Sequence, residues 1–152
     1  MNKQAKLGLK YGFPEQKKPS TMVVAPPQLL KNCELWEFKN DFPELVRLNV
    51  NKLYILKEFK SQLFDAFTAL RGHGLLGEIK TFDGCYNLRY VRGSVNTWSL
   101  HSWAAAIDMN ASNNPLNGKV SWSSDFLHIM REYVDCGADF KRVDGMHFEL
   151  KL

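Results

Sequence analysis

The chain has 152 residues, of which 45% are hydrophobic and 24% are charged, a composition typical of one globular domain with a sizeable core. No apolar run approaches the roughly 20 residues that a membrane-spanning helix needs, which argues against a membrane span. The formal net charge of +4 favours anionic partners. The lysines and arginines are dispersed, however, and form no basic stripe with interleaved aromatic residues, which argues against a nucleic-acid partner.

The N-terminus carries basic residues, but no apolar stretch follows them, so we expect no secretory signal peptide. The protein is then made in the cytoplasm, and any action elsewhere depends on release by another route. The three cysteines, Cys33, Cys85 and Cys136, are odd in number, widely spaced and without a C-x-x-C pair. Free reduced thiols are therefore expected.

Residues 1–50 are predicted to form an extended arm and an irregular segment that pack on a core domain at 51–152. The first 30 residues are polar and hold four of the six prolines, at positions 14, 19, 26 and 27. This pattern is typical of an extended segment at a chain end. Within it, residues 22–24 are predicted to form a short strand, whereas the segment that follows has a mixed pattern and predicts no clear element.

From Asn51 onward the pattern is more regular. Apolar residues recur at three- and four-residue steps and predict one face of a long helix that ends at Gly72 or Gly74; these residues are Leu56, Phe59, Leu63, Phe67 and Leu70. A short strand is predicted at 77–82, running into a turn at Asp83–Gly84. Residues 86–92 form a strand or a loop, and 104–109 a buried strand.

Residues 110–118 are predicted to be a loop. A second helix follows, capped by Ser123 or Ser124 and ended by Gly137, with its inward face formed by Phe126, Leu127, Met130 and Val134. Residues 140–143 and 146–152 are predicted to pair as strands around Asp144–Gly145, a dipeptide favoured in hairpins. Together these elements predict an α+β domain with a small antiparallel sheet and flanking helices.

The stretch S-L-H-S-W-A-A-A-I-D, residues 99–108, places Asp108 directly after apolar residues. A buried carboxylate is costly unless a positive charge meets it. His101, Asp108 and His147 together would form a Zn²⁺ site with one position open for water, and Asp144 would then be a general base. The alternative is an Asp–His pair that holds a loop to the sheet. The other two histidines, at positions 73 and 128, are predicted to be a solvated loop residue and a packed or surface residue.

Three motifs in order carry a resemblance to a known family. S-L-H-S-W-A-A-A-I-D resembles the S-x-H-x-x-G-x-A-x-D signature of the zinc D-Ala-D-Ala carboxypeptidases and their L-alanyl-D-glutamate endopeptidase relatives. D-G-M-H-F-E-L resembles their second signature, and C-Y-N-L-R-Y-V-R-G-S resembles a segment of the phage-endolysin-like branch. The resemblance covers residues 51–152. One departure is Ala104, which stands where the signature has glycine; an alanine is tolerable there if the backbone is β-like, but not easily if it needs a positive φ.

The resemblance implies a hedgehog-like or D-Ala-D-Ala-peptidase-like α+β fold and one zinc ion per chain, held by His101, Asp108 and His147. It implies Asp144 as the catalytic base. It also implies an upstream arginine that binds the substrate carbonyl or a carboxylate, with Arg89 preferred and Arg92 second.

Among the remaining candidates, Ser99 matches the leading serine of the signature and is expected to orient the substrate or a ligand. Tyr86, Trp98 and Trp103 are candidates to line the cleft, with core or rim packing as the alternative for each.

The implied substrate is a peptidoglycan stem peptide, acted on at the bacterial cell wall by a monomer. Three functions remain open. The first is an L-alanyl-D-glutamate endopeptidase of the phage-endolysin type, which the missing signal peptide and the Y-N-x-R-x-x-R-G-S segment favour. The second is a D-alanyl-D-alanine carboxypeptidase with the same ligands. The third is a metal-stabilised binding module without activity, which an intact base at Asp144 argues against.

Overall fold

The computed structural model describes residues 1–17 and 22–152. The N-terminal part is not an extended arm, because its first element is a helix, α1. Pro19 lies outside the described residues. The elements up to residue 56 are α1 (Lys3–Tyr11), β1 (Glu15–Gln16), β2 (Val23–Val24), α2 (Pro27–Lys31), β3 (Cys33–Trp36), α3 (Phe38–Asp41), the 3-10 helix η1 (Pro43–Leu45) and β4 (Leu53–Leu56). Strand β2 agrees with the predicted strand at 22–24.

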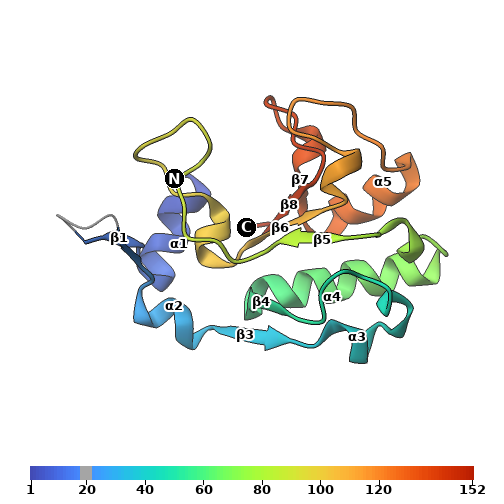
Figure 1. Cartoon of the computed structure of the whole chain (residues 1–152), viewed down its shortest axis with the longest axis horizontal. Helices are drawn as coiled ribbons and strands as arrows, with labels where there is room; N and C mark the ends of the chain where they lie inside the picture. The colour runs from blue at the N-terminus through green and yellow to red at the C-terminus, as the bar shows by residue number, and fades with distance from the viewer. Residues whose placement is uncertain (18–21) are drawn as a thin grey trace.

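The remaining elements form the part of the fold that carries the site. They are α4 (Lys57–Gly72), η2 (Leu76–Glu78), β5 (Phe82–Gly84), η3 (Leu100–Trp103), β6 (Ala106–Met109), η4 (Ala111–Asn113), α5 (Ser124–Tyr133), β7 (Asp135–Cys136), η5 (Gly137–Asp139) and β8 (His147–Glu149). Four of these strands form one antiparallel sheet in the order β5-β6-β8-β7. The antiparallel pairs β1–β2 and β3–β4 form two further two-stranded sheets (Figure 1).

The long helix α4 confirms the prediction from apolar spacing. Its predicted inward residues Phe59, Leu63, Phe67 and Leu70 are fully buried, and the helix ends at Gly72. Leu56 instead ends strand β4, where it is also buried. Helix α4 lies beside α5 (Figure 1). Ser123 caps α5, because its hydroxyl accepts a hydrogen bond from the backbone N–H of Phe126.

Two local predictions about strands are wrong. The strand predicted at 77–82 is shorter and later, because Leu76–Glu78 forms a 3-10 turn and the strand is Phe82–Gly84. The predicted pairing of 140–143 with 146–152 does not form. Strand β8 pairs instead with β6 on one edge and β7 on the other, and so lies inside the sheet.

Gly137 does not end α5, which stops at Tyr133. A Cβ atom on Gly137 would lie 2.2 Å from the carbonyl oxygen of Asp144 and 2.9 Å from that of His147. The backbone N–H of Asp144 donates to the carbonyl of Gly137 over 2.9 Å. The glycine therefore allows two chain segments to approach closely, and it fixes the turn that precedes β8.

The α+β fold class with a small antiparallel sheet and flanking helices is confirmed. Among the described residues, Cys33, Cys85 and Cys136 are buried free thiols, as predicted. In the described part of the chain, no helix combines the length and the apolar character that crossing a membrane requires.

Candidate active site

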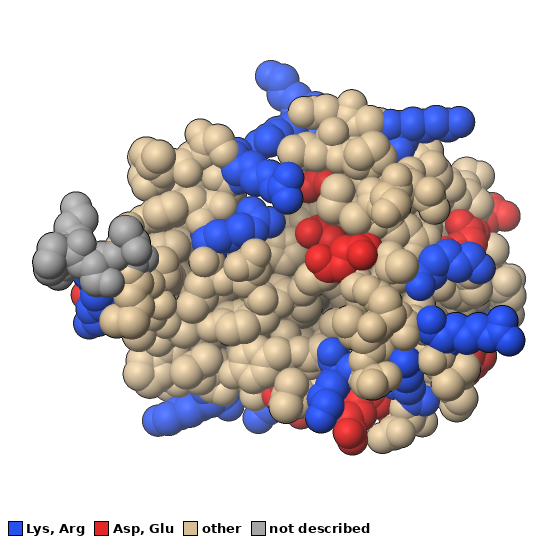
Figure 2. All heavy atoms as spheres, in the orientation of Figure 1, with Lys and Arg blue, Asp and Glu red and all other residues tan. Residues whose placement is uncertain are grey.

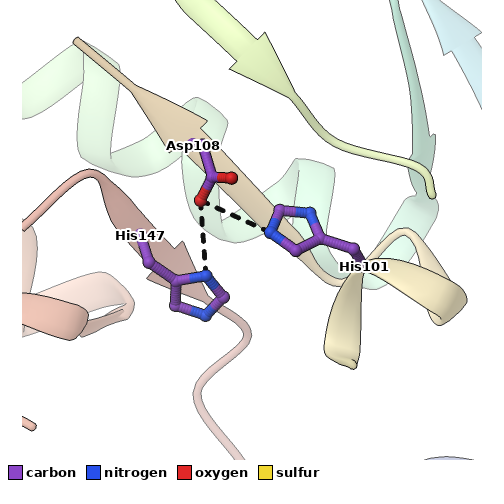
Figure 3. Close-up of side chains that lie close together, drawn as sticks. All are labelled: His101, Asp108 and His147. Atoms are coloured by element: carbon purple, nitrogen blue, oxygen red, sulfur yellow. Dashed lines mark ion pairs between the residues drawn. The ribbon is translucent and has the colours of Figure 1, made fainter. Parts of the chain in front are cut away.

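Three elements bring His101, Asp108 and His147 together. His101 lies on η3, Asp108 on β6 and His147 on β8, where Asp108 and His147 are direct cross-strand partners. The Oδ1 atom of Asp108 lies 3.4 Å from Nε2 of His101 and 3.4 Å from Nδ1 of His147. Figure 3 shows both imidazole rings turned toward this one carboxylate oxygen. One ligand atom from each of the three residues lies within 4.8 Å of the other two.

The outer nitrogen of each imidazole faces a hydrogen-bond acceptor. Nδ1 of His101 lies 2.9 Å from the carbonyl oxygen of Cys85, and Nε2 of His147 lies 2.9 Å from Oε1 of Glu149. Because a carbonyl and a carboxylate can only accept, each outer nitrogen carries the proton. The inner nitrogens then present lone pairs to the carboxylate of Asp108.

Lone pairs facing a carboxylate repel one another unless a cation lies between them. Within residues 1–17 and 22–152, the buried side-chain atoms without a hydrogen-bond partner are Nε2 of His101, Oδ1 of Asp108 and Oδ1 of Asp144. Ligand atoms about 2.0–2.1 Å from a tetrahedral zinc ion lie roughly 3.3–3.4 Å apart. The observed spacing of 3.4 Å therefore fits a metal ion held by His101, Asp108 and His147.

The electrostatics of the cluster follow from burial and close charges. Burial opposes ionisation of Asp108, but without a metal, protons on the inner nitrogens of His101 and His147 can meet its carboxylate instead; this attraction outweighs burial and holds the pKa of Asp108 well below its usual range. Burial would lower the pKa of His147, but the carboxylates of Asp108 and Glu149 outweigh it and raise that pKa to about 9. A proton and a metal ion compete for His147, so metal binding strengthens as the pH rises toward that value.

Asp144 lies beside the three ligands in a cleft of about 260 Å³. Its carbonyl accepts a hydrogen bond from the backbone N–H of His147, three residues later. The backbone of Asp144 also forms a bridge with Leu116 in the preceding loop. Burial raises the pKa of Asp144. Its position and its unpaired oxygen are those required of a general base, which stays a prediction.

Three arginines line the cleft. Arg89 and Arg92 are the two predicted from the sequence, and the structure adds Arg142. The guanidinium of Arg142 donates through Nη1 to the carbonyl of Arg92 over 2.9 Å, which ties the two segments together. Figure 2 shows acidic side chains near the centre of one face with Lys and Arg side chains beside them. Sequence analysis missed Arg142 because its segment was assigned to a strand.

The serines of the first motif hold neighbouring site residues in place. The hydroxyl of Ser99 caps η3 by accepting from the backbone N–H of His101, so it orients the segment that carries this ligand. The backbone N–H of Ser99 donates to the carbonyl of Arg89. The hydroxyl of Ser102, fully buried, accepts from the backbone N–H of Arg89 and donates to its carbonyl. Ser102 is a second residue that sequence analysis missed.

The three aromatic candidates lie outside the set of described residues that line the cleft. Trp103 is fully buried, and its indole N–H donates to the carbonyl of Gly12, so it belongs to the core. Tyr86 packs edge-on against Tyr54 at 5.0 Å between ring centroids. Trp98 stacks on Tyr90 at 4.1 Å. The alternative of core or rim packing is therefore the one that the structure supports for all three.

Ala104 adopts the left-handed conformation, with φ of 52° and ψ of 32°. A glycine, which the signature has at this position, adopts this conformation without strain, whereas an alanine is strained by about 1–2 kcal/mol. The position closes η3, since the N–H of Ala104 donates to the carbonyl of His101. The chain therefore makes this left-handed turn with an alanine, and His101 still converges with Asp108 and His147.

We expect Ala104→Gly to be nearly neutral for stability, whereas Ala106→Gly should lower the free energy of unfolding by about 1–2 kcal/mol. Both alanines are fully buried, so both variants lose a methyl group worth about 0.8 kcal/mol. In both variants the glycine also raises the conformational entropy of the unfolded chain, which lowers the free energy of unfolding. Only Ala104→Gly relieves left-handed strain. Denaturant unfolding of the two variants measures the difference, and equal losses would contradict it.

The sheet brings three candidate metal ligands and a further carboxylate together, an arrangement that fits a metallopeptidase. Residues 92–150 of the 152-residue chain match the family model described as D-alanyl-D-alanine carboxypeptidase. This match agrees with the resemblance carried by the motifs, and the matched segment contains all three candidate ligands and Asp144. Searches of curated proteins and of solved structures found no match.

Proposed function

We propose that the chain is a zinc-dependent peptidoglycan peptidase that cuts the L-alanyl-D-glutamate bond of the stem peptide, in the manner of a phage endolysin acting on the bacterial cell wall. The observation that carries this proposal is the cleft itself. It joins three converging metal ligands and a half-buried carboxylate to three arginines on one surface. Metal chemistry and recognition of an acidic peptide are thus combined at one place.

The side chains divide the work of peptide hydrolysis. His101, Asp108 and His147 would hold the zinc ion, which acidifies a water molecule and polarises the scissile carbonyl when bound. Asp144 would accept the proton of the attacking water and return it to the leaving amine. The raised pKa of Asp144 suits its role, because it makes the carboxylate a stronger proton acceptor. Arg89 or Arg92 would stabilise the developing oxyanion.

The arginines favour the endopeptidase over other peptidases with the same ligands. Cleavage between L-Ala and D-Glu requires recognition of a carboxylate on the D-Glu residue, inside the stem peptide. A guanidinium binds a carboxylate through two parallel hydrogen bonds, so one arginine can hold D-Glu while another serves the oxyanion. Arg89, Arg92 and Arg142 supply more cations than a single oxyanion requires.

A D-alanyl-D-alanine carboxypeptidase is the second candidate, and the description of the matching family favours it. Such an enzyme would use one of the same arginines to hold the C-terminal carboxylate of the substrate. A binding module without activity is the third candidate. It gives no reason for a half-buried carboxyl group with an unpaired oxygen next to the ligands.

Digestion of purified peptidoglycan tests these functions directly. We expect the newly formed N-terminus, identified by mass spectrometry of the muropeptides, to be D-Glu. Release of free D-alanine with the L-Ala–D-Glu bond intact would reject the endopeptidase and favour the carboxypeptidase. The absence of both products from a protein that binds zinc would favour the binding module. A chelator-treated sample is the control, because any cleavage that survives it comes from another activity.

A further inference from the structure

Helix α1 contacts the metal site from outside the segment that matches the family. Its first residue, Lys3, lies with Nζ 2.5 Å from Oδ2 of Asp135 and 2.5 Å from Oε2 of Glu149. Only 22% of the Lys3 side chain and 11% of the Glu149 side chain are exposed, so this pair is shielded from solvent screening. The contact joins residues 146 positions apart in the chain.

Lys3 offsets the repulsion between two like charges that face each other in the sheet. Asp135 on β7 and Glu149 on β8 are direct cross-strand partners, and two like charges in this arrangement repel each other. Lys3 bridges the two carboxylates. Its placement does nothing for the helix itself, because a cation in the first turn opposes the helix dipole, and that turn contains no acidic residue to offset it.

Glu149 connects Lys3 to the candidate metal ligand His147. Its other oxygen, Oε1, accepts the Nε2–H of His147, which keeps Nδ1 free to face Asp108. Carboxylates that accept from a ligating histidine orient its ring and raise its affinity for the metal. Lys3 holds the oxygen that does not contact the histidine. The order of contacts is therefore Lys3, Glu149, His147 and the metal position.

The other end of α1 contacts the element that carries His101. The carbonyl of Gly12, which follows the helix, accepts the indole N–H of Trp103 over 2.9 Å. The ring of Phe13 packs edge-on against Trp103 at 6.3 Å between centroids. Trp103 lies on η3 two residues after His101, and Gln4 of α1 lines the cleft. One helix thus touches the supports of two ligands.

We infer that α1 is part of the metal centre, with Lys3 as a positioning residue that orients His147 through Glu149. This inference rests on the metal site of the proposed function, but not on which peptide bond is cut. It assigns a role to residues at the N-terminus of the chain, before the segment that the family model matches. Lys3 acts only through Glu149, so its effect is on ligand geometry.

The test compares three variants of the full chain. Lys3→Met removes the charge and keeps the apolar stem, and Lys3→Arg keeps the charge. Lys10→Met is the matched control, because Lys10 lies on the same helix and pairs with Glu58 at 2.9 Å, away from the cleft. Zinc affinity is measured by competition with a chromogenic chelator. Ligand geometry is measured from the visible spectrum of the Co²⁺-substituted protein.

We expect Lys3→Met to bind zinc about tenfold more weakly than the wild type and to shift the Co²⁺ spectrum, as removal of an outer-shell partner does. Lys3→Arg should restore both, and Lys10→Met should match the wild type in both, whatever its melting temperature. Equal zinc affinity and identical spectra for Lys3→Met and Lys10→Met would overturn the inference and leave α1 a purely structural helix.

Glu149→Gln tests the same contacts without touching α1. We expect it to weaken zinc binding by about 10–100-fold. Zinc affinity equal to that of the wild type would overturn the inference even if Lys3→Met failed to fold. A wild-type protein that bound no zinc would instead reject the metal site on which the proposed function rests. Peptidoglycan digestion decides the cleaved bond independently.

Discussion

Asp144→Ala is expected to lower turnover of peptidoglycan by about 10²–10⁴-fold while the protein still binds one zinc ion per chain, since a positioned general base contributes about that much. Asp144 is not one of the three converging ligands, and its Oδ1 atom has no hydrogen-bond partner within the described residues. Its removal should therefore leave the metal in place and take away the proton acceptor. Initial rates of muropeptide release and metal content per chain measure the two quantities.

Asp139→Ala is the matched control for this prediction. Asp139 lies five residues earlier, is 46% exposed and pairs with Arg131 at 2.8 Å, outside the cleft. Its loss should change turnover by less than twofold, because Asp139 lies outside the cleft and an exposed ion pair contributes little to stability. If Asp144→Ala stayed fully active, another residue would be the base; Glu149 also lines the cleft, and it would have to give up its contact with His147 or Lys3 to serve.

Helices α4 and α5 and the candidate ligand set were predictable because they depend on local patterns. The apolar spacing of α4 and the cap of α5 each relate residues only three or four positions apart in the chain. The ligand types and their two motifs are equally local. The structure adds the register that makes them one site, since Asp108 and His147 are cross-strand partners only because β8 inserts between β6 and β7.

The parts that sequence analysis missed depend on contacts between distant residues. Four prolines favoured an extended N-terminus, yet α1 forms because Leu7 and Tyr11 are buried against the rest of the domain and Asn2 caps its start. Residues 140–143 have the composition of a strand, but β7 occupies the edge of β8 to which they would have paired. Tertiary packing outweighs local propensity in both places.

The left-handed turn at Ala104 is a different case, because the sequence raised the question and could not answer it. Its neighbours are small and apolar, which suits a strand as well as a turn. The conformation is set by η3, where two carbonyls accept from the N–H groups of Ala104 and Ala105. A glycine at this position would have indicated a left-handed turn in the sequence, whereas an alanine gives no such indication.

His147→Ala and His101→Ala are each expected to reduce zinc content from one ion per chain to nearly none. Each removes one of three protein ligands and leaves Asp108 facing a single imidazole, so the loss in affinity should exceed the 10–100-fold that outer-shell changes cause. Activity should fall with the metal content. Zinc is measured by elemental analysis after dialysis against a weak chelator, and activity by muropeptide release.

His73→Ala and His128→Ala are matched controls, because both histidines are exposed and lie outside the cluster. Both should retain one zinc ion and wild-type turnover. The wild type should also melt at a higher temperature with zinc than with a chelator, because a ligand that binds only the folded state stabilises it by mass action. This difference should vanish in His147→Ala and persist in His128→Ala. In the described residues, His101, Asp108 and His147 form the one group of three or more histidine, cysteine or acidic side chains arranged to hold an ion. A metal-free wild-type chain that still cleaved peptidoglycan would therefore reject the metal site.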